Sequence, residues 1–366
     1  MAEGTYAEAI TIGGKAVRLE GVCPQKVVLT SPEASPPCPL AGLCIVNGAD
    51  GTTIQGVTLT GSGFGVLLSG AADVTFRQVH VRDNPEGGID ADSSLGDTST
   101  TVAESLVERN GKQGVRAGSA SLVLESSVVR ETLPDAGSQL FGHGLILSSC
   151  APVTGSTGCV PRPRRPAHVR RSVIEGNRVA GVQSVDTEVT IEDTVIRNTL
   201  PEEASGAFGY GFSSYMYCPP EGCTADLVED LTLRHVFIDS STAMGIVATG
   251  HRLDIADTVV RDTTSAPGDG LFGDGIGLLS PFSGTPSAIV GTHIIRSARA
   301  GLSIFGSHAS VRDVRITCAP IEIALDPNQG VDPVLEDGGN NLCGCPVADG
   351  PCKAASAGLE PPTPLE

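Results

Sequence analysis

The chain of 366 residues carries 24 basic and 42 acidic side chains, which gives a formal net charge of −18. This excess of negative charge disfavours nucleic acid and anionic membranes as partners. No apolar run reaches the roughly 18 residues that a membrane-spanning helix needs, so we expect no transmembrane segment.

Residues 1–50 are predicted to form an N-terminal cap and the first coils of the solenoid described below. Met1 is followed closely by an alternating apolar run, Ala9-Ile10-Thr11-Ile12, which is typical of a strand. We interpret a strand so close to the first residue as a sign that a leader peptide has been removed.

From residue 59 onward a four-residue phrase returns: an apolar residue, a charged one, any residue, and then Asn, Thr or Ser. The first residues of successive phrases are 22, 26, 22, 45, 22, 42, 22, 35 and 21 positions apart. A step of about 22 with longer steps between predicts a solenoid, because a loop can lengthen one coil without disturbing the next. Strong copies begin at Val81, Val107, Val129, Ile174, Ile196, Ile238 and Val260, and weaker ones at Leu59, Ile295 and Ile316.

Each coil is predicted to consist of short strands joined by corners. The residue five positions before each phrase is apolar, and so in most coils is the residue two positions further back, as in a strand with one buried face. Such a coil buries that face only by stacking on its neighbours, through parallel pairing about 4.8 Å apart, and we expect about ten to twelve coils. The predicted inward column comprises Phe76, Val102, Leu124, Val169, Ile191, Leu233, Ile255 and Val290.

These repeats, of which Val189–Thr199 is an example, resemble those of right-handed parallel β-helix proteins of the pectate-lyase-like superfamily, of the secreted bacterial type. The resemblance covers about residues 45–320 and implies an all-β right-handed parallel β-helix over 51–320, with a cap and tail over 321–366. It also implies that the last residue of each phrase joins a polar ladder at a corner. Lyases, hydrolases, epimerases, adhesins and inert surface proteins share the fold, so it assigns no activity. The ladder residues are Asn84, Asn110, Thr132, Asn177, Thr199, Ser241 and Thr263.

Three of the longer steps share a second motif, Phe-Gly-x-Gly, which begins at Phe141, Phe208 and Phe272. A unit of two coils and a long loop therefore repeats after 67 and then 64 residues, which places all three insertions on one edge of the rod. Insertions on one side of a solenoid commonly form a binding face. The alternative is a duplicated loop whose phenylalanines only fill space. The predicted insertions cover residues 133–168, 200–224 and 264–287.

Several side chains in these insertions are candidates for ligand binding. His143, Tyr210 and Asp274 share one slot of the motif, but consecutive members lie two coils, or roughly 10 Å, apart, which is too far for a catalytic triad. They can instead line a groove for an extended ligand. The middle insertion adds tyrosines that either stack on sugars or close the loop, and the first adds arginines that either bind an anion or are solvated. These further candidates are Tyr215, Tyr217, Arg164, Arg165, Arg170 and Arg171.

No catalytic motif stands out in the sequence. A lyase of this fold needs carboxylates with a basic residue beside them. We find no Arg or Lys at a matching position beside Asp90 and Asp92 in the next coil, where Arg116 alone is nearby. We therefore expect a non-catalytic secreted or cell-surface protein without a cofactor, which binds an extended, acidic glycan or serves as a scaffold. The alternative is a polysaccharide-processing enzyme, a glycoside hydrolase or a lyase, with Ca²⁺ if it is a lyase. The oligomeric state is left open.

Eleven cysteines, mostly close together in pairs, indicate disulfides and an extracellular or periplasmic location. A zinc site is the weaker alternative, because the sequence has no paired Cys-x-x-Cys motif. The odd number leaves one thiol, for which Cys23 is the candidate, and the pairing of Cys38 and Cys44 is left open. The predicted disulfides are Cys150–Cys159, Cys218–Cys223, Cys318–Cys343 and Cys345–Cys352.

The second residue of the phrase alternates in charge from coil to coil. At a strand spacing of about 4.8 Å, opposite charges should stack as neighbours on the outer surface and disfavour slips in register. The members of this predicted charge ladder are Arg82, Glu108, Arg130, Glu175, Arg197, Asp239 and Arg261.

Overall fold

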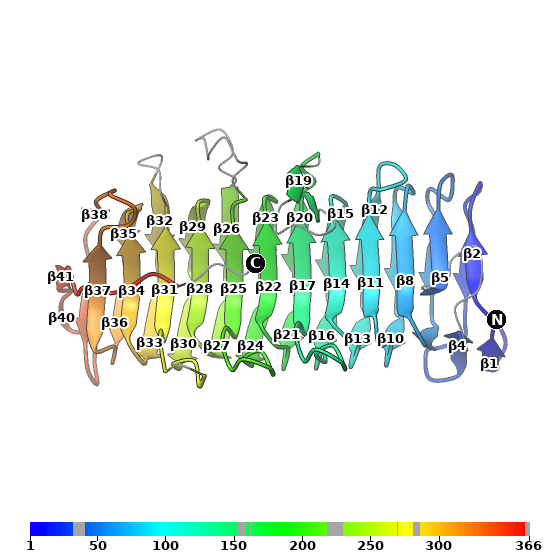
Figure 1. Cartoon of the computed structure of the whole chain (residues 1–366), viewed down its shortest axis with the longest axis horizontal. Helices are drawn as coiled ribbons and strands as arrows, with labels where there is room; N and C mark the ends of the chain where they lie inside the picture. Colours follow the sequence, from blue (N-terminus) through cyan, green and yellow to red (C-terminus); the bar gives the residue numbers. More distant parts are fainter. Residues whose placement is uncertain are drawn as a thin grey trace.

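The computed structural model describes residues 1–31, 41–152, 159–161, 163–217, 230–268, 270–280 and 286–362, without the side chains of 150–152 and 159–161. The described residues contain strands and no helix, and their coils stack into one rod (Figure 1). Three long parallel sheets, called A, B and C in the order in which each coil meets them, run along this rod. The protein is the right-handed parallel β-helix that the repeats predict.

Sheet A carries the apolar residue that starts each phrase. Val81, Val107 and Val129 are register partners on successive strands, and all three are fully buried. The strands of sheet A are β1 (Gly4–Ala7), β4 (Val27–Ser31), β7 (Thr58–Gly61), β10 (His80–Arg82), β13 (Leu106–Glu108), β16 (Val128–Arg130), β21 (Val173–Glu175), β24 (Val195–Thr199), β27 (Phe237–Ser241), β30 (Val259–Thr263), β33 (His293–Ser297), β36 (Arg315–Thr317), β39 (Leu342–Gly344) and β40 (Gly350–Pro351).

Sheet B has the longer strands, whose second residue is usually glycine. A Cβ atom on Gly114 would lie 2.5 Å from Val129 and 2.7 Å from the Gly144 carbonyl oxygen, so a side chain does not fit where each coil turns from sheet A into sheet B. The strands are β2 (Ile10–Ile12), β5 (Ala41–Val46), β8 (Phe64–Ser69), β11 (Gly87–Asp92), β14 (Gln113–Gly118), β17 (His143–Ser148), β22 (Ala180–Val185), β25 (Tyr210–Tyr215), β28 (Met244–Thr249), β31 (Asp274–Leu279), β34 (Ala300–Phe305), β37 (Ile321–Asp326) and β41 (Ala354–Ala355).

Sheet C carries the predicted inward column, which is confirmed from Phe76 through Ile255. The last member was wrong by one residue: Ile255 pairs with Ile289, which is buried, and not with Val290. The strands are β3 (Arg18–Glu20), β6 (Thr53–Gln55), β9 (Val74–Arg77), β12 (Ser99–Ala103), β15 (Ser121–Glu125), β20 (Ala167–Arg170), β23 (Val189–Glu192), β26 (Asp230–Arg234), β29 (Arg252–Ala256), β32 (Ser287–Val290), β35 (His308–Arg312) and β38 (Val334–Asp337), and β18 (Cys150–Pro152) pairs with β19 (Cys159–Pro161) outside the three sheets.

The predicted polar ladder lies inside the corner between sheets A and B. Asn84 donates from Nδ2 to Oδ1 of Asn110 at 2.8 Å, and the Thr132 hydroxyl donates to Oδ1 of Asn177 at the same distance. All seven ladder residues are buried. These hydrogen bonds satisfy polar groups that the tight corner removes from water.

The charge ladder is also confirmed on sheet A. Arg130 lies 2.6 Å from Glu108 and 3.8 Å from Glu175, and Arg197 lies 2.5 Å from Glu175. Farther along the rod, Arg261 lies 3.0 Å from Asp239. Two members differ from the expectation: Glu108 is buried beneath its partners and not exposed on the outer surface, and Arg82 pairs with Asp83 of its own coil.

Two disulfides close the C-terminal coils, but they join different cysteines from those predicted: Cys318–Cys345 and Cys343–Cys352. The register explains the pairing. Thr317 lies opposite Gly344, so Cys318 and Cys345 follow as neighbours, while Cys343 and Cys352 are brought together by the antiparallel pairing of β39 with β40.

Of the other cysteines, Cys23 is the free thiol among those that the structure describes, as expected, and Cys44 is in a disulfide. The side chains of Cys150 and Cys159, and the whole of Cys218 and Cys223, lie outside the described residues.

Candidate functional site

The outer face of sheet B carries a group of polar side chains. Side chains alternate between the two faces of a strand, and in β11 the buried Ile89 and Ala91 belong to the core. Asp90 and Asp92 therefore point outward. Arg116 has the same position in β14, and the register places it directly beside Asp90.

Two side chains of β14 hold the carboxyl group of Asp90. Nη1 of Arg116 lies 2.7 Å from Oδ1, and Nε2 of Gln113 donates to Oδ2 at 3.3 Å. Burial raises the pKa of Asp90, although the Arg116 guanidinium acts in the opposite direction. An aspartate that keeps its proton to a higher pH than usual is suited to act as a general acid.

Asp92 lies two residues further along the same strand and is held by different partners. Its Oδ1 accepts hydrogen bonds from the Ser69 hydroxyl at 2.7 Å and from the Ser94 main-chain N–H at 2.8 Å. The two aspartates therefore share a face and a strand, but their environments differ.

His143, on the strand after β14, pairs in register with Gln113. It is only 6% exposed, and its Nδ1 makes no hydrogen bond within the described part of the chain. Burial lowers the pKa of His143 to about 4, so the imidazole is neutral near pH 7. The ring of Phe141 lies 6.3 Å from the imidazole, centroid to centroid. At neutral pH the unprotonated imidazole can accept a proton, but the burial that lowers its pKa also makes it a weaker base, and Nδ1 is shielded from solvent.

We call Asp90, Asp92, Gln113, Arg116 and His143 the sheet B polar cluster. Sequence reasoning considered the two aspartates, but it was wrong to find no basic residue at a matching position. The signal was present, because Arg116 follows Asp90 by 26 residues, the same step that separates the phrases starting at Val81 and Val107.

Each of the three predicted insertions contains a strand of sheet B with a loop at either end. The first loops, residues 133–142, 200–209 and 264–273, all lie between sheets A and B, and thus on one edge. They also touch in series: Ala204 N–H donates to the Gln139 carbonyl at 3.2 Å, and Gly268 N–H to that of Gly206 at 3.1 Å. At the other end of the strand, the described part of the first insertion, residues 163–166, leads into β20 of sheet C.

His143, Tyr210 and Asp274 occupy one outward column of sheet B at intervals of two strands, as their shared motif predicts. Asp274 is fully buried and is bonded by Arg299 at 2.6 and 2.7 Å and by the Ser303 hydroxyl at 2.8 Å. With its oxygens bonded in this way, Asp274 is a structural group rather than a free carboxylate.

The candidate arginines lie on the edge between sheets B and C or on sheet C itself. Arg165 pairs with Asp97, and Arg170 lies 2.6 Å and Arg171 3.2 Å from the carboxylate of Glu125. Arg164 is exposed after β19. These side chains are therefore not on the edge that carries the Phe-Gly loops.

Of the candidate tyrosines, Tyr215 ends β25 on the outward side and is partly buried. Tyr217 is also partly buried, and its N–H donates to Asp186 at 2.9 Å. The two follow Tyr210 along one strand and the start of its loop, rather than forming a separate site.

A second hydrophobic cluster covers the outer face of sheet B toward the C-terminal end of the rod. We call it the outer apolar patch. The segment after β41 crosses this face (Figure 1), and its Leu359 packs against the patch. Asp326 fixes the segment by accepting hydrogen bonds from Ser356, Ala357, Gly358 and Leu359. The patch comprises Val179, Ala180, Tyr210, Ala243, Met244, Val247, Ala266, Leu279 and Phe305, with Phe208, Phe272 and Leu359 at its margin.

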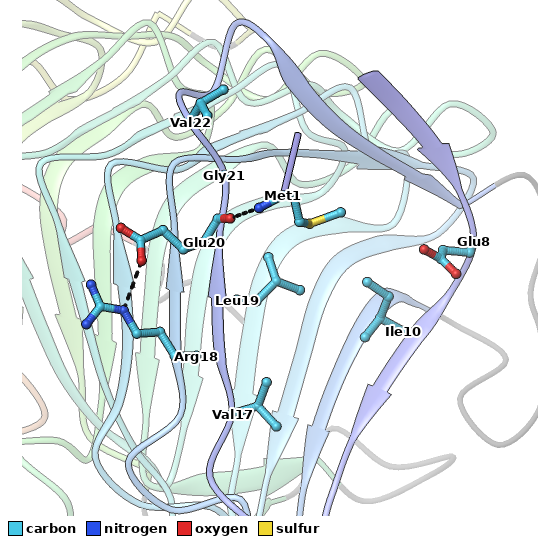
Figure 2. Close-up of a pocket in the computed structure, with 9 residues that line it drawn as sticks. All are labelled: Met1, Glu8, Ile10, Val17, Arg18, Leu19, Glu20, Gly21 and Val22. Atoms are coloured by element: carbon cyan, nitrogen blue, oxygen red, sulfur yellow. Dashed lines mark hydrogen bonds and ion pairs between the residues drawn. The ribbon is translucent and has the colours of Figure 1, made fainter. Parts of the chain in front are cut away.

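A pocket at the N-terminal end of the rod has a different character. Figure 2 shows Ile10, Val17 and Leu19 lining it, and these side chains continue the core into the first coil. Of the charged residues that line it, Arg18 and Glu20 pair with each other at 3.1 Å, and Glu8 lies on another side of the pocket. This pocket is the end of the apolar core and offers no polar group comparable to the sheet B cluster.

The described residues contain no group of three or more His, Cys, Asp and Glu side chains placed to hold a metal ion. They also include no helix long and apolar enough to cross a membrane.

Comparison with known proteins gives structural but not sequence matches. No protein-family profile and no curated protein sequence matches the chain. The A-module of the mannuronan C-5 epimerase AlgE4 from Azotobacter vinelandii has a similar structure, with a TM-score of 0.62 and 16% identity over 92% of this chain and 90% of that one.

Two further structures share the fold over part of their length. The catalytic unit of a GH87 alpha-1,3-glucanase from Streptomyces thermodiastaticus has a TM-score of 0.54 and 15% identity, covering 93% of this chain and 62% of its own. The Dettilon tailspike protein has a TM-score of 0.50 and 9% identity, covering 92% of this chain and 62% of its own.

These comparisons correct the expectation of a non-catalytic protein. Two of the three structures are named as polysaccharide-active enzymes, an epimerase and a glucanase, which favours the alternative of a polysaccharide-processing enzyme. At identities of 16% and below, the structural likeness shows only the fold. The activity must therefore be argued from the residues of the sheet B polar cluster.

Proposed function

We propose that the protein is a polysaccharide-processing enzyme whose reaction takes place at the sheet B polar cluster, with glycoside hydrolysis as the leading reaction. The observation that carries the proposal is the pair of aspartates on the outer face of β11. Burial raises the pKa of Asp90, and Asp92 is oriented separately by Ser69 and Ser94. Two carboxyl groups in different environments are what glycoside hydrolysis requires.

In this mechanism protonated Asp90 donates its proton to the glycosidic oxygen as the bond to the anomeric carbon breaks. Asp92 accepts a proton from the water that attacks the same carbon, and the products are two shorter saccharides. Residues two apart on a strand are separated by roughly 7 Å. Carboxyl groups about 6.5–9.5 Å apart leave room for that water, so the anomeric configuration is inverted.

Charge favours a neutral polysaccharide as the substrate. The cluster contains two aspartates and one arginine, and that arginine is already paired with Asp90. The whole chain has a formal net charge of −18, which repels a polyanion.

A second candidate is proton abstraction from a uronic acid unit, as in a lyase or an epimerase. The specific observation is His143, a buried imidazole with a pKa of about 4 and an unbonded Nδ1. It would act as the base, and Arg116 would face the sugar carboxylate. The expected Ca²⁺ dependence belongs to this candidate.

We also propose that the protein acts outside the cytoplasm. The two C-terminal disulfides support export, because such bonds persist in oxidising compartments.

The test is an activity screen on neutral glucans of several linkages, alginate and polygalacturonate, with and without EDTA. Hydrolysis releases reducing ends from a neutral glucan without ultraviolet absorbance from unsaturated uronates. Asp90→Asn should reduce the rate by at least 100-fold, in line with the loss of a general acid. The matched control is Asp239→Asn, which changes an aspartate of the charge ladder on sheet A.

Unsaturated uronate products that depend on His143 would favour the second candidate. If no polymer is cleaved or epimerised, or if Asp90→Asn keeps full activity, the proposed function is wrong.

A further inference from the structure

Phenylalanine recurs in an unfavourable backbone conformation at one edge of sheet B. Phe141, Phe208 and Phe272 have φ angles of 70°, 64° and 64°, in the left-handed region that bulky residues rarely adopt. Glycine would fit this conformation without strain. Left-handed angles also occur at Lys112, Val179 and Ala243 before other strands of sheet B, so the corner sets the angle, and what distinguishes the three positions is their shared aromatic side chain.

Each phenylalanine lies two residues before a strand of sheet B, beside a residue of the outward column or one bonded to it. Phe141 lies 6.3 Å from His143, Phe208 lies 5.8 Å from Tyr210, and the guanidinium of Arg299 lies 5.1 Å from the ring of Phe272. Their strands, β17, β25 and β31, are separated by one strand each. The rings therefore follow one another along the rod at intervals of about 10 Å.

The loops that hold these rings are unusually apolar on the outside. Five of the nine large hydrophobic side chains that are exposed in the described residues lie on them. None of the five belongs to the core, and exposed apolar side chains gathered on neighbouring loops are a feature of surfaces that contact other molecules. They are Leu133, Leu140, Phe141, Leu200 and Leu271.

We propose that Phe141, Phe208 and Phe272 form a track that binds an extended polysaccharide parallel to the rod, with one ring for every second sugar. An interval of two coils matches the length of a disaccharide unit in an extended chain, and aromatic faces stack on the C–H faces of sugar rings. Phe141 is 44% exposed and adjoins His143 of the polar cluster, so the track leads to the site of reaction. This inference rests on the proposed function.

The distal part of the track is covered by the chain itself. Leu359 packs against the same outer apolar patch as Phe208 and Phe272, and the Glu360 carbonyl accepts a hydrogen bond at 3.4 Å from Arg299, whose guanidinium lies over the Phe272 ring. The segment 356–362 therefore competes with a long polymer for these two rings, and Phe141 is the ring that is open beside the polar cluster.

Affinity electrophoresis in native gels cast with soluble starch, dextran, mixed-linkage β-glucan or alginate measures binding without turnover. We expect one polymer to retard the protein, and Phe141→Ala to weaken that binding roughly three- to tenfold. The matched control is Val334→Ala, because Val334 is equally exposed at 44% but lies on sheet C.

Phe141→Gly separates binding from folding. Glycine relieves the φ of 70°, so this variant should melt at the same temperature or higher while it binds as weakly as Phe141→Ala. A lower melting temperature with unchanged binding would make Phe141 structural and overturn the proposal.

Leu359→Ser tests the distal part of the track. Releasing the segment should tighten binding of the long polymer, and adding Phe272→Ala should remove that gain. Failure to tighten, or a gain that survives Phe272→Ala, contradicts the track.

The outcomes also separate this inference from the proposed function. If the protein cleaves a polymer and Phe141→Ala does not affect the cleavage, the proposed function stands and the proposed track is wrong. If a polymer binds in a way that depends on Phe141 but is neither cleaved nor epimerised, the proposed track stands and the proposed function is wrong. If no polymer binds, or if sedimentation shows a dimer that Phe141→Ala dissociates, the track is wrong and the apolar loops join two copies of the chain.

Discussion

Asp90 and Glu108 are both acidic side chains largely withdrawn from water, but their surroundings shift their pKa values in opposite directions. Burial dominates at Asp90, whose pKa is raised. At Glu108 burial also acts to raise the pKa, but hydrogen bonds from Arg130, Arg109 and His80 together outweigh it and lower the pKa to about 2. A raised pKa suits Asp90 to proton transfer, whereas the lowered pKa of Glu108 means that its ionised form stabilises the fold.

For Asp90 we expect that removing the charge stabilises the fold. Because the folded-state pKa is raised, ionised Asp90 costs stability at neutral pH, and this cost disappears as the pH falls below that pKa. Asp90→Asn should therefore melt at a higher temperature than the wild type at pH 7, with a difference that narrows toward pH 3. Circular dichroism melts across this range provide the measurement, and a lower melting temperature at pH 7 would show that Asp90 mainly stabilises the coil.

Ionised Glu108, unlike ionised Asp90, stabilises the fold. Its folded-state pKa is depressed from 4.5 to about 2, so its contribution is present above pH 4.5 and is lost as the pH falls toward 2. Glu108→Gln should lower the free energy of unfolding by about 2 kcal/mol at pH 7, and by little near pH 2. Urea unfolding at several pH values tests this, with the exposed Glu104→Gln as the control; equal losses at all pH values would contradict it.

At the scale of the strand and its loop, periodicity made much of the fold predictable from sequence. Phe76, Val102 and Leu124 share a column because every coil must place an apolar side chain at the same point. The coil that contains β33 was misaligned because Ile294 and Ile295 are both apolar. Only the register shows that Ile294, and not Ile295, continues the buried column of sheet A from Val260.

The polar cluster and the C-terminal disulfides were harder to predict, because each depends on which coils lie side by side. Asp90 and Arg116 meet only when the 26-residue step is applied to them. Cys318 meets Cys345 through pairing of β36 with β39, whereas the prediction joined cysteines by their closeness in sequence. The burial of His143 under its loop leaves no sequence signal at all.

The charge ladder makes a prediction about neighbouring strands. Glu175 lies 3.8 Å from Arg130 and 2.5 Å from Arg197, so Glu175→Arg places three like charges in a row. We expect a loss of roughly 1 kcal/mol that grows at low salt, since exposed ion pairs contribute about 0–1 kcal/mol each and are screened. Glu175→Gln, which removes the charge without reversing it, should lower the melting temperature less than Glu175→Arg. A loss independent of salt would mean that packing, not charge, is responsible.

At the scale of the whole molecule, the charge ladder and the Phe-Gly loops share a period of two coils. Arg130, Arg197 and Arg261 each precede one of the three loops, and Glu175 and Asp239 lie between them. Two features of different chemistry, one outside sheet A and one at the edge of sheet B, thus repeat together.

Because of this common period, such a rod can keep its charge alternation only if it loses or gains two coils at a time. Removal of residues 145–211 joins Gly144 to Phe212, two equivalent points of sheet B, and brings Arg130 beside Asp239 with the alternation intact. Removal of 174–195 takes out a single coil and brings Arg130 beside Arg197. The longer deletion should therefore give the more stable protein, measured by urea unfolding, and a rod about 10 Å shorter by X-ray scattering. If the shorter deletion is the more stable, the charge ladder does not determine how many coils can be removed. If the prediction holds, a pair of coils is the smallest unit that can be removed with the charge alternation intact.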